Sequence, residues 1–547
     1  MKKIIFFLVF SIIIINSFGN QTSQEIVPGS YIILLKDMPN YDPGVLNSDF
    51  SNREDLIIRS IENSSAAQAA FLRSSALTRT LEVTNSFWAT NMLVINCDDS
   101  KIIDELKKHP MVEEIVPEQR ETRMPVERIS STDWSRDEFT YGLKLMGIDK
   151  IWSQYNLKGQ GMLGGVVDDM PDMAHQDLAG KIVAWWDCDG NTVAKADTEE
   201  HCTHVSGTIV GGNKSGKHIG IAPEAKLVVA NAFTQIPPYN YKTSDFVGAM
   251  QFILDPDGNP KTDDFPRVVN NSWSSGGVSL LKKVVAQYTR LGVIPVFAAG
   301  NSGTSGAATI AQVNSLEDVI TIGAVDENSK IAYFSSLGPG VYQYWLTEKP
   351  DFCAPGYQIY SSINGNKYDS WNGTSMASPH VTGAILLILQ ANPDLDKKRL
   401  YNILKESTSK PATHNAKKHD YTYGWGTIDA YKAVTLALSN PKWSPAPRIT
   451  YTYPDTVYFS GSLAINPDKG TLSNITVTVN GVEKLNQSLN KSFQNFKIQF
   501  SKSKLLYPPP KGTISIEDLG VGEKVFKVSV KASNGTITEK TFTYTFY

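Results

Sequence analysis

Residues 372–380 read Asn-Gly-Thr-Ser-Met-Ala-Ser-Pro-His, and a mostly apolar run, residues 381–389, follows them. This pattern predicts a turn that leads into the N-terminus of a buried helix, with Pro379 in the first turn, where a missing N–H costs nothing. Free N–H groups and the positive end of the helix dipole would then surround the hydroxyl of Ser375 and favour developing negative charge there. A serine in this place is by itself most often only a helix N-cap, so its role depends on the residues that accompany it.

The composition is that of a globular protein. The chain has 547 residues, of which 41% are hydrophobic and 20% are charged, and this length is enough for about three or four domains. The formal net charge is -3, which favours neither a nucleic acid nor an anionic membrane surface as a partner.

The first 19 residues have the pattern of a secretory signal peptide. Two lysines precede a largely apolar run, residues 4–15, and small residues at Ser17 and Gly19 suit a cleavage after Gly19. The alternative, a membrane anchor, needs about 20 apolar residues, and the run is shorter. No other run is apolar enough, and the chain has no hydrophobic tail of the GPI type. We therefore expect a secreted, extracellular protein without a membrane anchor.

The four cysteines are Cys97, Cys188, Cys202 and Cys353. Their spacing fits no zinc site. Four cysteines allow three pairings, and a Cys188–Cys202 disulfide is one possibility in an exported protein. If Cys97 leaves with a removed segment, an odd number remains.

Residues 20–125 alternate short strands with helices, which predicts a small α+β domain of ferredoxin-like type. We expect strands at 30–36, 88–95 and 112–116, and helices within 51–80 and at 102–108. The polar, charged stretch 119–135 suits an exposed linker that a protease can cut.

Residues 126–440 are predicted to form an α/β domain, in which a parallel sheet is covered by helices on both faces. Functional residues in such folds gather at the carboxyl ends of strands. We expect strands at 162–167, 227–232, 268–271, 293–298 and 319–325, and helices at 244–254, at 280–291 and after Ser375.

The last part of the chain has a different pattern. Residues 441–447 form a proline-rich linker, and residues 448–547 carry short alternating strands at 473–479, 524–532 and 537–546. Asn-Gly pairs at 480–481 and 534–535 are strong hairpin signals between such strands. We therefore expect an all-β sandwich.

Three other polar residues resemble Ser375 in their placement, because each is expected where a strand or helix begins or ends. Asp168 ends the apolar run 162–167, His201 opens the segment His-Cys-Thr-His-Val-Ser-Gly, and Asn301 follows the apolar run 293–298. Each has an ordinary alternative: the Asp and the Asn are favoured turn residues, and His201 with His204 could be a metal pair, although no third ligand is suitably spaced.

The four segments, in this order, resemble those of the subtilisin-like serine proteases (subtilases). The order Asp, His, Ser distinguishes this family from chymotrypsin and from the α/β-hydrolases, which removes an α/β-hydrolase esterase from consideration. Residues 334–339 and 349–356 also match family segments, and residues 20–125 resemble the inhibitory propeptide. The resemblance covers roughly residues 30–440.

The resemblance implies a role for each residue. Ser375 attacks the peptide carbonyl, His201 carries the proton, and Asp168 orients His201. The Asn301 side chain and the Ser375 backbone N–H hold the oxyanion. The alternative is a catalytically dead subtilase fold that binds a partner through residues 448–547.

The resemblance also implies where substrate binds. Ser272, Trp273 and Ser274 match the strand that pairs with the substrate backbone. Ala299 and Gly300 lie before the oxyanion residue, and Ala311 matches a glycine at the floor of the P1 pocket. These substrate-binding residues complete the predicted site: Ser272, Trp273, Ser274, Ala299, Gly300 and Ala311.

Several positions depart from the family pattern. Asp169-Met170 replaces Thr/Ser-Gly, and Cys202 replaces the glycine after the histidine. Ser274 and Ala311 replace glycines, which predicts a narrowed pocket that prefers small or medium P1 residues. The alternative is that neighbouring loops move outward and restore the volume.

No cofactor is required by the implied mechanism. Asp177 matches a ligand of the family's tight calcium site, but Lys214 stands where the family supplies a ligand from an asparagine. Because an ammonium competes with a cation bound by oxygens, we expect this calcium site to be lost or replaced by a Lys214–Asp177 pair.

Taken together, the sequence predicts a monomeric zymogen. Its partners are protein or peptide substrates and its own propeptide, which the enzyme is expected to remove within residues 119–135.

Overall fold

The computed structural model describes most of the chain. The described residues are 26–39, 41, 53–121, 126–129, 137–236, 241–275, 278–342, 345–415 and 417–439, together with the strands of the C-terminal region. The predicted signal peptide, the linker 441–447 and the Asn-Gly pair at 534–535 lie outside these residues.

The N-terminal unit is a four-stranded antiparallel sheet with the order β2-β3-β1-β4. Its elements are β1 (Ile26–Leu35), α2 (Arg53–Arg73), η1 (Thr78–Thr80), β2 (Glu82–Phe87), β3 (Met92–Asn96), α3 (Ser100–Leu106) and β4 (Val112–Gln119). Acidic residues in the first turn of α2 and Arg73 in its last turn complement the helix dipole. The strand expected at 88–95 is wrong in its first half, because residues 88–91 form the turn between β2 and β3.

A seven-stranded parallel sheet forms the centre of the molecule, with the order β14-β11-β10-β9-β6-β8-β7. The strands are β6 (Leu163–Asp168), β7 (Ile182–Asp187), β8 (Lys226–Asn231), β9 (Val268–Asn271), β10 (Ile294–Ala298), β11 (Ile320–Val325) and β14 (Phe352–Pro355). The α/β fold with a parallel sheet is therefore confirmed.

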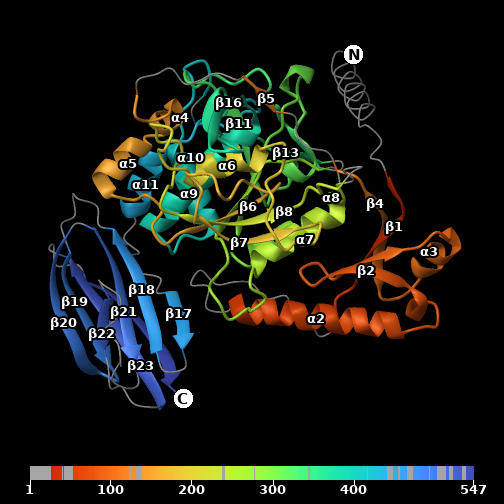
Figure 1. The fold of residues 1–547 in the computed structure, drawn as a ribbon, viewed down its shortest axis with the longest axis horizontal. Helices are drawn as coiled ribbons and strands as arrows, with labels where there is room; N and C mark the ends of the chain where they lie inside the picture. The colour runs from red at the N-terminus through yellow and green to blue at the C-terminus, as the bar shows by residue number, and fades with distance from the viewer. Residues whose placement is uncertain are drawn as a thin grey trace, which may run out of the picture.

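Helices cover both faces of this sheet (Figure 1). They are α4 (Tyr141–Leu145), α5 (Ile148–Tyr155), α6 (His201–Val210), α7 (Thr243–Leu254), α8 (Val278–Arg290), α9 (Thr374–Ala391), α10 (Lys397–Ser407) and α11 (Ala430–Ser439). Val166 packs in the cluster that contains α6 and α9, whereas its neighbour Val167 packs in the cluster that contains α7 and α8. This alternation is expected because successive side chains of a strand point to opposite faces.

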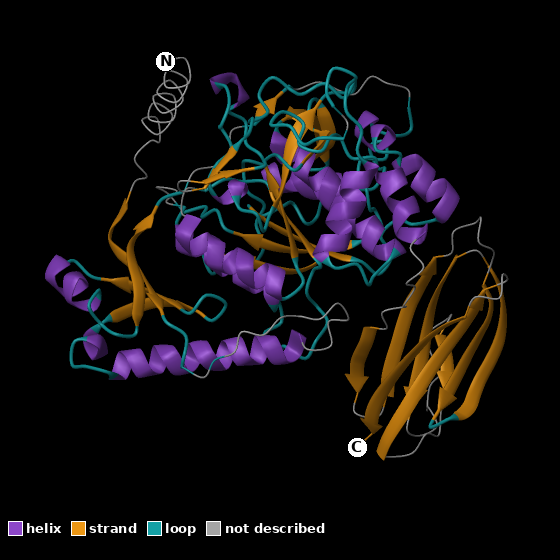
Figure 2. Cartoon of the chain, turned by 180° about the vertical axis from the view of Figure 1, so that it is seen from behind, coloured by secondary structure: helices purple, strands orange, loops and turns teal. Residues whose placement is uncertain are grey.

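The N-terminal unit packs against α7 and α8. Apolar residues of its sheet, such as Ile32 and Met92, share one buried cluster with Phe246, Met250 and Leu281 of those two helices. The long helix α2 lies at the bottom of the molecule in both views (Figures 1 and 2). Two smaller sheets belong to the central part: β12 (Gly340–Tyr342) with β13 (Trp345–Thr347), and β15 (Ile359–Ile363) with β16 (Lys367–Asn372) and β5 (Glu127–Arg128).

The C-terminal region is all-β, with two four-stranded sheets. The strands are β17 (Arg448–Tyr453), β18 (Thr456–Ala464), β19 (Leu472–Val479), β20 (Val482–Lys491), β21 (Phe493–Ser501), β22 (Thr513–Ile516), β23 (Gly522–Ala532) and β24 (Ile537–Phe546). Asn480 and Gly481 have φ values of 50° and 78°, so they form the predicted hairpin turn between β19 and β20. Within the described residues, no helix has both the length and the apolar character needed to cross a bilayer.

All four cysteines are free thiols in the structure. The Cys188–Cys202 disulfide considered above is therefore wrong. Cys202 is enclosed in the first turn of α6, where its Sγ contacts Ser206 Oγ, whereas Cys188 follows β7 and its backbone N–H bonds to the carbonyl of Asn231.

Candidate active site

The fold brings the four predicted residues to one edge of the sheet. Asp168 is the last residue of β6, and Asn301 follows β10. His201 is the first residue of α6, and Ser375 is the second residue of α9. In a parallel sheet the carboxyl ends of all strands lie at the same edge. Asp168 and Ser375 can therefore lie close together although they are 207 positions apart (375 − 168) in the sequence.

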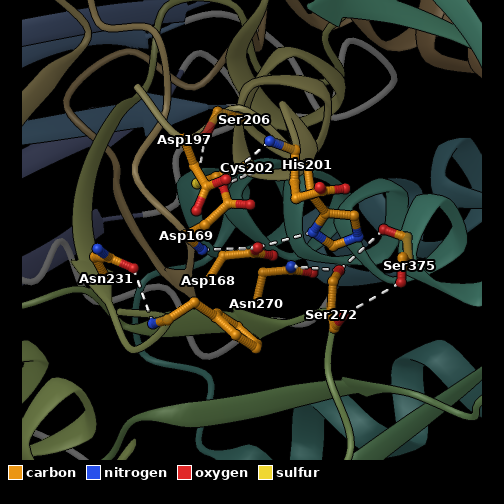
Figure 3. A network of polar contacts seen from close by, with 12 residues as sticks. Asp168, Asp169, Asp197, His201, Cys202, Ser206, Asn231, Asn270, Ser272 and Ser375 are labelled. Atoms are coloured by element: carbon orange, nitrogen blue, oxygen red, sulfur yellow. Dashed lines mark hydrogen bonds and ion pairs between the residues drawn. The ribbon is translucent and has the colours of Figure 1, made fainter. Parts of the chain in front are cut away.

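The imidazole of His201 lies between Asp168 and Ser375 (Figure 3). Its Nδ1 is 2.8 Å from Asp168 Oδ1, and the Asp168 side chain is almost fully buried. Because a carboxylate only accepts hydrogen bonds, this contact places a proton on Nδ1 and makes Nε2 the proton acceptor of the ring. Asp168 therefore orients His201 with Nε2 ready for base catalysis.

Ser375 and Ser272 exchange two hydrogen bonds. The Ser375 hydroxyl donates to the Ser272 carbonyl at 3.2 Å, and the Ser272 hydroxyl donates to the Ser375 carbonyl at 2.9 Å. Proton transfer to His201 requires the Ser375 hydroxyl to rotate about its Cα–Cβ bond. Such loose geometry is common before substrate binds.

Pro379 explains why the second of these bonds is needed. It lies inside α9 and not in its first turn as predicted, because the helix already begins at Thr374. The residue four positions before Pro379 is Ser375, whose carbonyl loses its helical partner because proline has no N–H. Ser272 supplies the missing donor.

The amide of Asn301 is held in one orientation by Thr374. Its Oδ1 accepts hydrogen bonds from the Thr374 backbone N–H and from the Thr374 hydroxyl, both at 2.9 Å. The Nδ2 group, which is a donor, lies beside Gly373 at the entry to α9. This arrangement can present N–H donors to an oxyanion. Sequence reasoning did not assign a role to Thr374, although it directly precedes Ser375.

Gly300 is required where it stands. Its φ of +107° is a conformation that other residues rarely adopt, and a Cβ atom there would lie 2.9 Å from Ser336 Oγ. Its N–H donates to the Thr374 hydroxyl at 3.0 Å, which links the Asn301 strand end to α9.

The second carboxylate, Asp169, has an oxygen within 4.8 Å of an Asp168 oxygen but has a hydrogen-bond partner of its own. Its Oδ1 accepts the backbone N–H of Cys202 at 2.8 Å, while Asp168 contacts His201. Glu200, the residue before α6, has φ 61° and offers no side-chain cap. Asp169 therefore satisfies an N–H at the start of α6 and places negative charge at the positive end of its dipole.

Cys202 is a buried, protonated thiol. Burial, followed by the charges of Asp168 and Asp169, raises its pKa well above the ordinary value. A thiol with a raised pKa is a poor nucleophile and a poor metal ligand. The bulk that it adds beside His201 packs within α6 and introduces no second reactive group.

The predicted substrate strand has one unexpected feature. The Trp273 side chain is 1% exposed and packs against Phe246 and Phe297, with ring centroids 4.6 and 5.0 Å apart. The side chain of Trp273 therefore lies in the core, and its carbonyl accepts the Asn314 amide at 3.0 Å, while Ser274 beside it is half-buried.

Two of the predicted substrate-binding residues are alanines close to Asn301 in sequence. Ala299 is fully buried, and its N–H donates to the carbonyl of Ile322. Ala311 is half-buried before η3 (Val313–Ser315), and its carbonyl accepts the Ser315 hydroxyl at 2.9 Å.

Asp177 does not fit a calcium ion. Its Oδ1 accepts the backbone N–H of Lys214 at 3.1 Å, and its Oδ2 accepts the Tyr368 hydroxyl at 2.7 Å. The expected Lys214–Asp177 pair is thus wrong in detail, because the backbone of Lys214 makes the contact. The ammonium whose charge acts on Asp177 belongs to Lys181. Both carboxylate oxygens of Asp177 therefore already accept hydrogen bonds, and a cation lies nearby.

Residues before and after the stretch 122–125 contact segments near this site, which the sequence alone did not reveal. The N–H of Glu121 donates to the carbonyl of Tyr241 at 2.7 Å. β5 pairs antiparallel with β16, so that Glu127 lies opposite Asn372, three residues before Ser375. The Glu127 carboxylate accepts hydrogen bonds from the Asn372 amide and the Tyr333 hydroxyl, both at 2.7 Å, and the Asn372 bond is the main cause of its lowered pKa.

The parallel sheet and the Asp, His and Ser residues at its edge define a serine protease of the Asp-His-Ser order. A comparison with family models matches residues 159–426 to the subtilase family. Subtilisin DY of Bacillus licheniformis is 32% identical over 295 residues, which cover 54% of this chain and 97% of that protein. The chain belongs to the subtilase family and is a subtilisin-like serine endopeptidase.

Other relatives differ more in length. Serine protease AprX of Bacillus subtilis is 32% identical over 310 residues, which cover 51% of this chain and 67% of that protein. Bacillopeptidase F of Bacillus subtilis is 28% identical over 391 residues, which cover 64% of this chain. The matched region spans only 26% of the length of bacillopeptidase F.

Proposed function

We propose that this protein is an exported serine endopeptidase, made as an inactive zymogen that removes its own N-terminal segment. The observation that carries the proposal is the arrangement of Asp168, His201 and Ser375 (Figure 3), together with the amide of Asn301, which Thr374 holds at the entry to the same helix. The predicted signal peptide supports export. The proposed enzyme acts as a monomer.

In the proposed mechanism, Ser375 Oγ attacks the carbonyl carbon of the peptide bond while His201 Nε2 accepts its proton. The resulting oxyanion is held by the Asn301 Nδ2 group and the Ser375 backbone N–H. His201 then protonates the leaving amine, the C–N bond breaks, and an acyl-enzyme remains. Water, activated by His201, then attacks the acyl carbonyl; the acid product leaves and Ser375 regains its proton. In both halves of the reaction Asp168 orients His201 and stabilises its cation.

Contacts of the N-terminal segment support its role as an inhibitor. Glu118 is 1% exposed, and its carboxylate accepts the Ser244 backbone N–H at the start of α7. Glu121, which also precedes the proposed cut, donates its N–H to the carbonyl of Tyr241, whereas Glu127, which stays with the mature protein, pairs with Asn372. The proposed cut therefore lies between Glu121 and Glu127, within the predicted stretch 119–135.

The test is the fate of the Ser375→Ala precursor. We expect it to accumulate uncut, while wild type yields a mature protein whose N-terminus lies between residues 122 and 127 by sequencing. A Ser153→Ala variant, which changes an exposed hydroxyl on α5, serves as the control and matures normally. Normal processing of Ser375→Ala would assign the cut to another protease.

The preference for small or medium P1 residues is part of the proposal. It is supported by side chains at Ser274 and Ala311, where the family pattern has glycine. Peptides that differ only at P1 test it, and the best kcat/KM on Phe or Tyr would contradict it. The proposed mechanism uses no metal, because Ser375 supplies the nucleophile and His201 the base.

A further inference from the structure

We propose that the hydroxyls of Thr243 and Ser275 form a subsite that recognises an acidic substrate side chain on the amino-terminal side of the cut bond. This inference rests on the proposed function, and it adds a specificity that the family pattern does not state. The occupant seen in the structure is the carboxylate of Glu121, from the segment that the enzyme is proposed to remove.

The geometry of this contact is that of a built site. Glu121 Oε1 accepts the Thr243 hydroxyl at 2.8 Å and the Ser275 hydroxyl at 2.7 Å. The exposed fractions are 5% for Glu121, 0% for Thr243 and 4% for Ser275. A carboxylate removed from water in this way needs strong hydrogen bonds, and short O–H bonds to a charged acceptor provide them.

The two hydroxyls come from elements that already border the active site. Thr243 is the first residue of α7, so the positive end of that helix dipole faces the carboxylate. Ser275 continues the segment that begins at Ser272, whose carbonyl contacts Ser375. The subsite is therefore fixed relative to the nucleophile by one short piece of backbone.

The backbone of Glu121 is held as a substrate backbone would be. Its N–H donates to the carbonyl of Tyr241, and Arg120 forms an antiparallel bridge with Lys242. An extended peptide that adds to this edge repeats these bonds and carries its side chain to the same place. Glu121 thus shows where a substrate residue on that side of the cut would be placed.

Charges around the subsite change when the N-terminal segment leaves. Glu118 contacts the Ser244 N–H in the precursor and departs with the segment. Asp245 remains and accepts the Lys242 N–H at 3.1 Å, while burial raises its pKa to about 7. The loss of Glu118 removes a carboxylate from the N-terminus of α7. The positive end of that helix dipole can then interact with the acidic side chain of a substrate.

The experiment uses mature enzyme and peptides that carry Glu, Gln, Ala or Lys at the position of Glu121 relative to the cut found by N-terminal sequencing. A hydrogen-bonded carboxylate should raise kcat/KM for Glu over Ala by about tenfold or more. Lys should be the poorest, because its ammonium faces the positive end of the α7 dipole. A Glu/Ala ratio near one, or a preference for Ala, would overturn the inference without any variant.

Variants then assign the preference to the two hydroxyls. In Thr243→Val/Ser275→Ala the Glu/Ala ratio should fall to within about twofold of one, whereas Ser153→Ala should keep the wild-type ratio. An unchanged ratio in the double variant would overturn the assignment. Labelling by a fluorophosphonate probe separates the two proposals: enzyme that is labelled and cuts the Ala peptide without preferring Glu refutes only the subsite, and enzyme that is neither labelled nor active refutes the proposed function.

Discussion

The hydroxyl of Ser272 donates to the carbonyl of Ser375 at 2.9 Å and takes the place of the N–H that Pro379 lacks. The same serine holds the Ser375 hydroxyl through its own carbonyl. Ser375, the proposed nucleophile, is thus positioned by β9 and its continuation as well as by its own helix, since Ser272 directly follows β9.

Ser272→Ala should therefore disturb catalysis although Ser272 performs no chemistry. It leaves the buried Ser375 carbonyl without this donor, which costs about 1–3 kcal/mol of folding free energy. We expect kcat to fall more than KM rises, because the change acts on the nucleophile. Ser272→Thr keeps the hydroxyl and should restore most of both quantities, measured by urea unfolding and peptide kinetics. Equal losses in the two variants would show that side-chain size, and not the hydrogen bond, matters.

Asn301→Asp isolates the role of the amide donor. The aspartate keeps an oxygen for the two Thr374 donors but replaces Nδ2 by a second oxygen. We expect kcat to fall by about 10²–10³ or more with little change in KM, the size known for the oxyanion amide of a subtilisin relative. A volume-matched Asn301→Leu should lose a similar factor. A change confined to KM would place Asn301 in ground-state binding.

Two buried histidines should make the protein sensitive to mild acid. Burial, followed by the charge of His201, lowers the pKa of His204 to about 3, and burial lowers the pKa of His380 to about 4. The unfolded chain titrates both near 6.5, so below that pH it binds more protons than the folded protein. Stability is therefore fully present above 6.5 and is lost as the pH falls toward 4, with a slope of roughly 1.4 kcal/mol per pH unit for each histidine.

Urea unfolding of Ser375→Ala between pH 7.5 and 5 measures this slope without self-digestion, over the window that the shifts of about 3 to 6.5 define. Adding His204→Gln should remove about half of the histidine contribution to the slope. Parallel curves for the two proteins would show that His204 is not the group that titrates.

Replacing Asp177 tests the absence of calcium from its site. Asp177→Asn weakens the bonds from the Lys214 N–H and the Tyr368 hydroxyl, and we expect a loss of about 1–2 kcal/mol. The loss should be the same with calcium as with a chelator, measured by thermal unfolding. A loss seen only with calcium would mean that Asp177 holds the ion.

The sequence predicts the central strands of the parallel sheet well, but it misses β2 and β14, which are end strands of their sheets. β6, β9 and β10 are short apolar runs between turn signals, and they were expected within a residue or two. β2 was missed because its burial pattern is mostly exposed and carries no apolar alternation. β14 was missed because it has only four residues, one of them a proline.

The candidate site also has a part that the sequence predicts and a part that it does not. Asp168, His201, Asn301 and Ser375 could be named because each sits in a local segment with its own pattern. Contacts between distant positions left no such trace. The bond from Ser275 to Glu121 joins residues 154 positions apart, and the reciprocal bonds of Ser272 span 103 positions. The residues next to Ser275 and Ser272 in the sequence do not indicate that Glu121 and Ser375 are their hydrogen-bond partners.

The most direct test of the account is covalent labelling of the mature enzyme with a fluorophosphonate probe, followed by mass spectrometry of the labelled peptide. The account predicts a single adduct on Ser375, a rate of labelling that falls by several orders of magnitude in His201→Ala, and no adduct in Ser375→Ala made with its N-terminal segment removed by another protease. An unlabelled wild type, or an adduct on a different serine, would contradict it.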